Sequence, residues 1–268
     1  MHIGVTVRNM GPQSTPEIMQ QCVLAAEQHG LESVWITDHI AIPPDDAEGS
    51  GGRYTDTLTT LAWMAGLSRH IKLGSGVLIL PYRAPLPTAK QVATIQELSA
   101  GRLLLGVGIG WMDPEFKALG IDRHRRGEIS DGILAFLEQC FEHETVVANG
   151  QEFLFKPRPA RPPVLIGGRA PHAIRRALRY GDGWMPMAQK PEQIEADVAA
   201  YFEEARATNA QASVTVMGGL PSNDAGLARQ TLAAYADMGV ERFVCAMRYS
   251  DVSEYLSGLD RLASVIGG

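Results

Sequence analysis

The sequence is organised around one stretch, Leu103-Leu104-Leu105-Gly106-Val107-Gly108-Ile109-Gly110-Trp111. Its first half is aliphatic without polar alternation, which is typical of a strand buried on both faces of a parallel sheet. Its second half has glycine at every second position. Because glycine weakens a strand, this spacing indicates that some group approaches the backbone closely at the strand's C-terminal end. Ligands of parallel α/β barrels bind at that end, so we expect a flat ligand to lie across it.

Strand-like and helix-like segments alternate on both sides of this stretch. The earlier strands are predicted at Ile3–Val7, Ser33–Thr37 and Ile71–Leu80, and the earlier helices at Ser14–His29, Thr55–Ser68 and Pro85–Leu98. The later strands are predicted at Val164–Ile166, Trp184–Met187, Ser213–Met217 and Arg242–Ala246, and the later helices at 127–142, Pro171–Tyr180, Glu192–Thr208, Ala225–Met238 and Val252–Val265. About eight β/α repeats result, which predicts an α/β protein with a single (β/α)8 TIM barrel over residues 1–268.

Two segments interrupt the repeats. Asn149-Gly150 stands between the runs 145–148 and 151–155, which is the pattern of a two-residue β-hairpin turn. We therefore expect a small β-hairpin insertion at about residues 144–162. Residues 43–53 are rich in proline, acidic residues and glycine, and we interpret them as a mobile loop over the ligand-binding end.

The composition is that of an ordinary globular protein, with 45% hydrophobic and 20% charged residues. A formal charge of −6 argues against nucleic acid or an anionic membrane as the main partner. The chain starts without the basic segment of a secretory signal, and no apolar run reaches the ~18 residues of a membrane span. The scattered Cys22, Cys140 and Cys245 indicate neither disulfides nor a metal cluster. We expect a cytoplasmic protein without a metal site.

Asp38-His39 follows the strand predicted at 33–37, at the ligand-binding end of the barrel. An imidazole there could donate or accept a proton near neutral pH, or hydrogen-bond a heteroaromatic ring. The alternative is that His39 only holds a loop in place.

Gly74-Ser75-Gly76-Val77 breaks the strand predicted at 71–80. Two glycines there indicate a bulge rather than regular pairing. One interpretation is a packing feature of the barrel. The other is a strained peptide bond that supports one face of a bound ring, because such strain costs on the order of 3 kcal/mol and persists mainly at functional sites.

The glycines at 106–110 are spaced G-x-G-x-G, which differs from the G-x-G-x-x-G fingerprint of dinucleotide-binding folds. Pro114 is also expected to interrupt any helix that starts there, so we reject that fold. Gly167-Gly168-Arg169, before the helix predicted at 171–180, is a better anion site, since glycines expose backbone N–H groups and a helix N-terminus is positive. A plain turn is the alternative.

The remaining basic and aromatic residues have ordinary explanations first. Arg123-His124-Arg125-Arg126 and the arginines of the helix predicted at 171–180 are expected mainly on solvated surfaces, with contact to an acidic ligand tail as the second interpretation. Core packing is expected for Trp184, whereas Trp111 is equally consistent with packing and with the wall of a pocket. The cysteines are interpreted as small buried hydrophobic residues.

Five motifs taken together resemble the luciferase-like monooxygenase superfamily, in particular its short deazaflavin-dependent oxidoreductases. They are Glu32-Ser33-Val34-Trp35-Ile36-Thr37-Asp38-His39, Leu73-Gly74-Ser75-Gly76-Val77-Leu78, Leu98-Ser99-Ala100-Gly101-Arg102, Gly106-Val107-Gly108-Ile109-Gly110-Trp111, and Ile166-Gly167-Gly168 with Gly181-Asp182-Gly183-Trp184. Each is modest alone, but their order and their barrel positions are specific. The resemblance extends to about Pro186 and fades beyond it.

The resemblance implies a barrel that binds coenzyme F420, a 5-deazaflavin, or FMN at its C-terminal mouth. The implied ring support includes a non-prolyl cis peptide bond between Gly76 and Val77, and the implied phosphate site is Gly167-Gly168-Arg169. The implied catalytic residues are His39, as proton donor or acceptor, and Asp38; the implied cofactor-binding residues are Ser75, Gly76, Val77, Gly108, Gly110, Trp111, Gly167, Gly168 and Arg169.

One position departs from the superfamily. Its sugar-phosphate dehydrogenase branch has an acidic glutamate directly after the G-x-G-x-G run, where this chain has Trp111. The difference argues against that branch's substrate and favours an uncharged or aromatic one.

Three functions remain open at this stage. The first is a hydride-transfer oxidoreductase that uses coenzyme F420 and an unknown small organic substrate. The second is an FMN-dependent monooxygenase that uses oxygen and reduced flavin from a partner reductase, and the third is a non-catalytic flavin-binding barrel. The resemblance further implies a homodimer.

Overall fold

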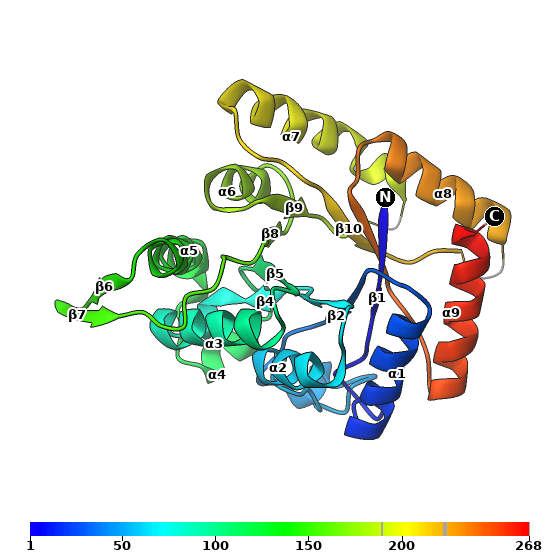
Figure 1. Cartoon of the computed structure of the whole chain (residues 1–268), viewed down its shortest axis with the longest axis horizontal. Coiled ribbons are helices and arrows are strands. Elements are labelled where there is room, and N and C mark those ends of the chain that lie inside the picture. The colour runs from blue at the N-terminus through cyan, green and yellow to red at the C-terminus, as the bar shows by residue number, and fades with distance from the viewer. Residues whose placement is uncertain (189, 222–223, 268) are drawn as a thin grey trace.

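The barrel strands are parallel and follow one another in the order β10-β11-β1-β2-β3-β5-β8-β9, across the residues that the computed structural model describes, 1–188, 190–221 and 224–267 (Figure 1). Their bounds are β1 His2–Thr6, β2 Ser33–Ile36, β3 Lys72–Ser75, β5 Leu103–Gly108, β8 Val164–Gly167, β9 Gly183–Met185, β10 Thr215–Gly218 and β11 Arg242–Cys245. The two ends of this order meet through the pairs Trp184–Val214 and Met187–Met217, so the sheet is nearly closed. The predicted (β/α)8 barrel is confirmed.

Helices occupy the connections between strands and cover the outside of the barrel (Figure 1). The longer ones are α1 Pro16–Gln28, α2 Thr57–Leu67, α3 Pro85–Leu98, α5 Arg126–Glu142, α6 His172–Tyr180, α7 Glu195–Thr208, α8 Ala225–Asp237 and α9 Val252–Ile266. Single 3-10 turns lie at η1 Pro44–Asp46, η2 Leu80–Tyr82, η3 Arg123–Arg125 and η4 Pro191–Gln193. Side chains that accept from backbone N–H groups begin several of the helices, namely Thr15, Asp56, Asp224 and Asp251.

The short helix α4, Asp113–Ala118, is one that the sequence pattern did not predict. Pro114 lies in its first turn, where a backbone N–H has no intrahelical partner to lose. The expectation that Pro114 would interrupt a helix here is wrong, because the proline begins the helix. Helix α4 matters for the site, since it carries the buried acid Glu115.

Two irregularities of the sheet agree with the sequence. The strand predicted at 71–80 is divided into β3 and β4, Leu78–Ile79, which both pair with β5. Between them the peptide bond from Gly76 to Val77 is cis. The hairpin of β6, Thr145–Ala148, and β7, Gln151–Leu154, is antiparallel and projects beside α5 (Figure 1).

The interior of the barrel is filled by its own small cluster of side chains. Six buried residues, each from a different strand, form this cluster: Trp35, Leu104, Leu165, Met185, Met217 and Val244. The Trp35 indole lies so close to Gly74 that a Cβ there would approach the ring to 2.3 Å. A larger cluster packs the strands against the helices and includes all three cysteines, whose predicted burial is confirmed. The barrel is thus a packed core, and any ligand has to bind at its mouth.

Candidate functional site

Asp38 lies buried just beyond the end of β2, with 3% of its surface exposed. Its Oδ2 accepts from the backbone N–H of Ile79 at 2.8 Å and from Arg83 Nη1 at 2.6 Å. Its Oδ1 accepts from Arg83 Nη2 at 2.9 Å and from the Thr57 hydroxyl at 2.8 Å. Both oxygens are therefore engaged in fixing the end of β2 to β4 and α2, so a role in positioning its neighbour His39 suits Asp38 better than proton transfer.

His39 is held by the carboxylate of Glu115. Its Nδ1 lies 2.7 Å from Glu115 Oε2, and the Glu115 side chain is fully buried. Glu115 Oε1 accepts from the backbone N–H groups of Ile40 at 2.7 Å and Ala41 at 2.9 Å. The hydroxyl of Tyr82 donates to Oε2 at 3.0 Å. One acid therefore fixes both the imidazole and the backbone that follows it.

Two further aromatic rings flank the imidazole. Tyr54 meets His39 edge-on with ring centroids 5.0 Å apart, and Trp111 does so at 6.2 Å. Burial and the Glu115 carboxylate raise the pKa of Tyr54, which keeps its hydroxyl neutral. Trp111 is 64% exposed, so it lies at the surface beside His39 and not in the core. No described residue hydrogen-bonds to His39 Nε2, which leaves this atom open to a ligand.

The glycines of β5 make room for the chain itself. A Cβ at Gly106 would lie 2.0 Å from the carbonyl oxygen of Ser75, and one at Gly108 would lie 2.5 Å from Val77 Cγ2. A Cβ at Gly167 would approach Val77 Cγ1 to 2.8 Å. The sequence indicated that some group approaches the β5 backbone closely, and that group is the bulge Ser75–Val77. These three glycines seat the bulge and let it reach the mouth, where Val77 is only partly buried.

Gly110 also has a packing reason for its place in the motif. Its φ is +75°, a value that side-chain-bearing residues rarely adopt, and a Cβ would lie 2.8 Å from Ile79 and 3.0 Å from Phe116. The chain turns tightly at this glycine from β5 into α4. Contact of Gly108 and Gly110 with a cofactor stays a prediction.

The loop Gly167-Gly168-Arg169 leads from β8 into α6. Gly168 has a φ of +125°, and its carbonyl accepts from Trp184 Nε1 at 2.9 Å. Trp184 itself is 1% exposed, so its predicted core position is confirmed. Its hydrogen bond to Gly168 attaches the loop to the core. Arg169 is exposed and has no ion-pair partner among the described residues. A free cation beside a helix N-terminus suits an anionic group.

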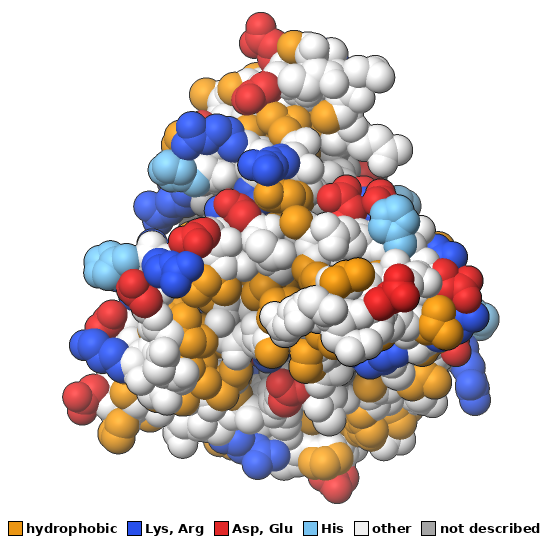
Figure 2. Space-filling view, turned by 90° about the vertical axis from the view of Figure 1, so that its left-hand side faces the viewer, with side chains coloured by type: hydrophobic (Ala, Val, Ile, Leu, Met, Phe, Trp, Pro, Cys, Tyr) orange, Lys and Arg blue, Asp and Glu red, His pale blue; other side chains and the backbone are white. Residues whose placement is uncertain are grey.

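Two of the other arginines singled out in the sequence form ion pairs within the described chain. Arg125 forms an ion pair with Glu128 at 2.8 Å, and Arg176 forms one with Asp131 at 2.6 Å. On the face that carries the projecting hairpin, basic side chains alternate with acidic ones and form no continuous positive surface (Figure 2). Arg125, Arg175 and Arg179 are exposed, as expected for a solvated surface, whereas Arg123, Arg126 and Arg176 are partly buried.

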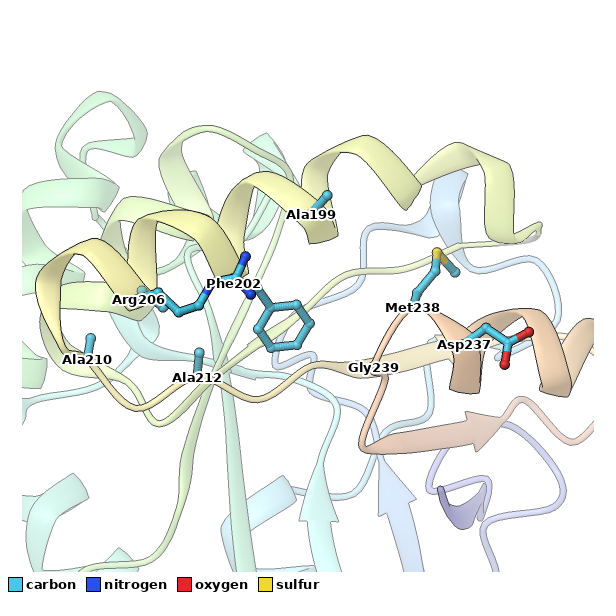
Figure 3. A pocket seen from close by; sticks show the side chains of 9 residues that line it. Ala199, Phe202, Arg206, Ala210, Ala212, Asp237, Met238 and Gly239 are labelled. Carbon is cyan, nitrogen blue, oxygen red and sulfur yellow. The ribbon is translucent and has the colours of Figure 1, made fainter.

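A cavity of about 490 Å³ lies between α7 and the end of α8 (Figure 3). The Phe202 ring points into it from α7, and Met238 and Gly239 bound its other side. It holds none of the sequence-predicted site residues, and a single arginine and a single aspartate are its charged lining. In the described part of the chain no three histidine, cysteine or acidic residues are grouped to hold a metal, and no helix is long and apolar enough to span a bilayer.

Comparison with known proteins identifies the family. The sequence model of luciferase-like monooxygenases matches residues 1–242. The chain belongs to the luciferase-like monooxygenase family. An uncharacterized protein of Mycobacterium tuberculosis is 30% identical over 213 residues, which are 69% of this chain and 71% of the relative. The F420-dependent hydroxymycolic acid dehydrogenase of the same organism is 31% identical over 175 residues, 62% of this chain and 47% of the relative.

Solved structures share the fold at low sequence identity. A monooxygenase from Streptomyces bottropensis superposes with a TM-score of 0.80 at 19% identity, covering 99% of this chain and 98% of that one. An F420-dependent secondary alcohol dehydrogenase, in complex with an F420-acetone adduct, also reaches 0.80, at 16% identity and with the same coverage. These matches confirm the barrel and leave the cofactor open.

Sequence reasoning singled out His39 and missed the acid that holds it. Glu115 lies 76 residues from its partner, and no spacing rule connects the two. One local signal was available, because Asp113-Pro114-Glu115 has the acids and the proline that favour a helix's first turn. This signal would have predicted α4 and an acid close to the mouth. No sequence pattern indicated that Tyr82 or Tyr54 would lie close to His39.

Proposed function

We propose that this luciferase-like protein is an oxidoreductase that transfers hydride between coenzyme F420 and a small organic substrate. The observation that carries the proposal is the His39 imidazole, fixed at the barrel mouth with Nε2 open. Only Nδ1 is engaged with a protein group in the described chain, and the His39 side chain keeps 14% of its surface exposed, so Nε2 can take a ligand as its partner. An open, rigidly held imidazole suits proton transfer to a bound molecule.

The residues at the mouth suit a cofactor with a flat ring and an anionic side chain. The bulge Ser75–Val77 reaches the mouth between Gly108 and Gly167, and its Val77 side chain would contact one face of a ring. Arg169 is exposed and unpaired within the described chain, next to the N-terminus of α6, where a phosphate would be favoured. The exposed Trp111 and Met187 add apolar surface at the ends of β5 and β9.

Coenzyme F420 is our first choice and FMN the alternative. The motif resemblance is to the short deazaflavin-dependent group, and a relative that is 31% identical over 62% of this chain is named for F420. The fold similarity to a monooxygenase is at 19% identity and keeps the FMN-dependent monooxygenase, with a partner reductase, as the second candidate. A bound deazaflavin would supply hydride transfer and would largely lack the oxygen reactivity of a flavin.

The chain's own residues would then divide the remaining work. Val77 and the bulge orient the ring, Arg169 holds the phosphate, and Trp111 with Tyr54 excludes water from one side of the imidazole. His39 Nε2 moves the proton that accompanies hydride transfer. We also propose a homodimer, which gel filtration with light scattering would test.

Paired titration of the apo-protein with F420 and with FMN, followed by fluorescence, tests the proposal. Preferential binding of F420 is the expected result, with His39→Gln retaining that binding and losing turnover. Preference for FMN would move the function to oxygen chemistry. Binding of neither cofactor would contradict the flavin interpretation of the mouth altogether.

A further inference from the structure

The contacts of Glu115 define its charge. Its Oε1 faces two backbone N–H groups, those of Ile40 and Ala41, which can only donate. Its Oε2 faces His39 Nδ1 and the Tyr82 hydroxyl. A protonated carboxyl group needs an acceptor for its own hydrogen, and Oε1 has none. The hydrogen of the 2.7 Å contact therefore lies either on Oε2 or on His39 Nδ1, and the three donors from Ile40, Ala41 and Tyr82 that already surround the carboxyl group favour its ionised form.

The titration behaviour agrees with this geometry. Burial opposes the charged form, but the hydrogen bonds from the Ala41 N–H, the His39 ring and the Ile40 N–H outweigh it and hold the pKa of Glu115 below its ordinary value. An ionised carboxylate only accepts hydrogen bonds, so the hydrogen between the two groups belongs to His39 Nδ1. In the neutral ring the lone pair is then on Nε2.

We propose that Glu115 is the positioning residue of this site, which keeps the hydrogen of His39 on Nδ1 and so makes Nε2 the atom that exchanges a proton with the bound molecule. The inference rests on the proposed function for the use of that proton. It adds the residue that sets the tautomer and the orientation of the imidazole. It also supplies a charge to stabilise the imidazolium that forms whenever Nε2 takes up a proton.

The surroundings of α4 are built to keep Glu115 in place. Phe116, the next residue, meets Tyr82 edge-on with ring centroids 5.0 Å apart, and both belong to a small buried cluster with Ile79. Tyr82 thus anchors α4 through its ring and Glu115 through its hydroxyl. The tight turn at Gly110 brings the helix to this position directly after β5. Rigid support of this kind is what precise orientation of a proton-transfer group requires.

The decisive variant is Glu115→Gln, which keeps the size and removes the charge. The amide oxygen can still accept from Ile40 and Ala41, but the amide nitrogen then faces His39 Nδ1 as a donor. Nδ1 has to become an acceptor, so the hydrogen should move to Nε2. Long-range 1H–15N spectra of apo-protein labelled at histidine report this tautomer directly, and His39→Asn identifies the signal.

Turnover gives a second, separate readout. We expect Glu115→Gln to lower kcat on the order of 10²-fold or more, because an ill-placed proton-transfer group loses the 10²–10⁴-fold that such groups contribute. Cofactor binding should change little, since Glu115 does not reach the mouth. In a His39→Asn background the same substitution should have no further effect on kcat, which a merely structural role would not produce.

Two variants serve as controls. Tyr82→Phe removes the other donor to Oε2 but leaves the charge, so the Nδ1–H tautomer should persist. Glu32→Gln removes a carboxylate that binds Arg242 on β11, and it should cost stability without changing the His39 signals. Together they separate the effect of the Glu115 charge from that of losing a hydrogen bond or a buried acid.

The outcomes are distinct. Hydrogen on Nδ1 in the unaltered protein, moved to Nε2 by Glu115→Gln, together with a loss of kcat, supports the inference. Hydrogen on Nε2 in the unaltered protein, or a kcat that Glu115→Gln leaves intact, overturns it. Failure to bind either cofactor would overturn the proposed function but not the tautomer, which the apo-protein spectra decide.

Discussion

At the scale of single residues, two buried carboxylates fix the position of His39. They are the side chains of its neighbour Asp38 and of Glu115. Asp38 fixes the backbone before the imidazole, through Arg83 and the N–H of Ile79. Glu115 fixes the imidazole and the backbone after it. The two acids look alike in sequence, yet one is bound to a cation and the other to the titratable ring. Adjacent in sequence, Asp38 and His39 therefore have different partners, Arg83 for the acid and Glu115 for the imidazole.

The Asp38–Arg83 pair gives a prediction for stability. Asp38→Asn leaves the Arg83 guanidinium, 9% exposed, without its main partner, and breaking a buried pair in this way costs about 3–5 kcal/mol. The second acid on Arg83, Asp56, is 46% exposed, so Asp56→Ala should lose only about 1–2 kcal/mol, mainly from its capping of α2. Urea unfolding of both variants measures the difference. Equal losses would show that Asp38 contributes no more than a helix cap.

At the scale of elements, strands and long helices were predictable and the contacts between them were not. Aliphatic runs such as Leu103–Leu105 and caps such as Thr15 act locally, so sequence alone placed these elements within a few residues. The bulge after β3 was predictable from its glycines. Its partners on β5 and β8 were not, because they depend on how three strands meet.

The close contact between the backbones of β3 and β5 predicts the effect of adding a side chain at Gly106. In Gly106→Ala the new Cβ would lie 2.0 Å from the Ser75 carbonyl oxygen, which is backbone and cannot turn away. We expect a loss of about 1–3 kcal/mol or more in the free energy of unfolding, together with weaker cofactor binding, because the bulge must move. Urea unfolding and cofactor titration measure the two effects.

Gly132 on α5 provides the matched control for that substitution. It is exposed, and a Cβ there meets nothing within 4 Å. Gly132→Ala should therefore raise the free energy of unfolding by about 0.5–1 kcal/mol, since alanine is the better helix former. A stable Gly106→Ala protein with unchanged cofactor affinity would refute the account of the bulge.

At the scale of the whole molecule, the two ends of the barrel do different work. The mouth presents His39 and the loop before α6, with Glu115 buried behind the imidazole, whereas the opposite end joins strands from the beginning and the end of the chain. There the Arg242 guanidinium on β11 binds Glu32, which precedes β2, through two hydrogen bonds of 2.8 Å. The partners are 210 residues apart in sequence, and Lys72 at the start of β3 adds a third contact to the same acid. This cluster holds neighbouring strands in register far from the site.

The Glu32 cluster predicts how the stability of the whole barrel depends on pH. Burial alone would raise the pKa of Glu32, but hydrogen bonds from Arg242, Ser33 and Lys72, together with the charge of Arg242, lower it from 4.5 to about 2. Its unfolded value is higher, so the unfolded chain binds the proton more readily and acid favours unfolding. The stabilisation is fully present above pH 4.5, is lost as the pH falls toward 2, and amounts to about 3 kcal/mol.

In urea unfolding, Glu32→Gln should be less stable than the unaltered protein at pH 7, and the difference in the free energy of unfolding should shrink between pH 4.5 and pH 2. The exposed Glu128→Gln should differ little from the unaltered protein at any pH, because its partner Arg125 is solvated. A Glu32→Gln difference that stays constant down to pH 2 would mean that the acid lability of the barrel arises elsewhere.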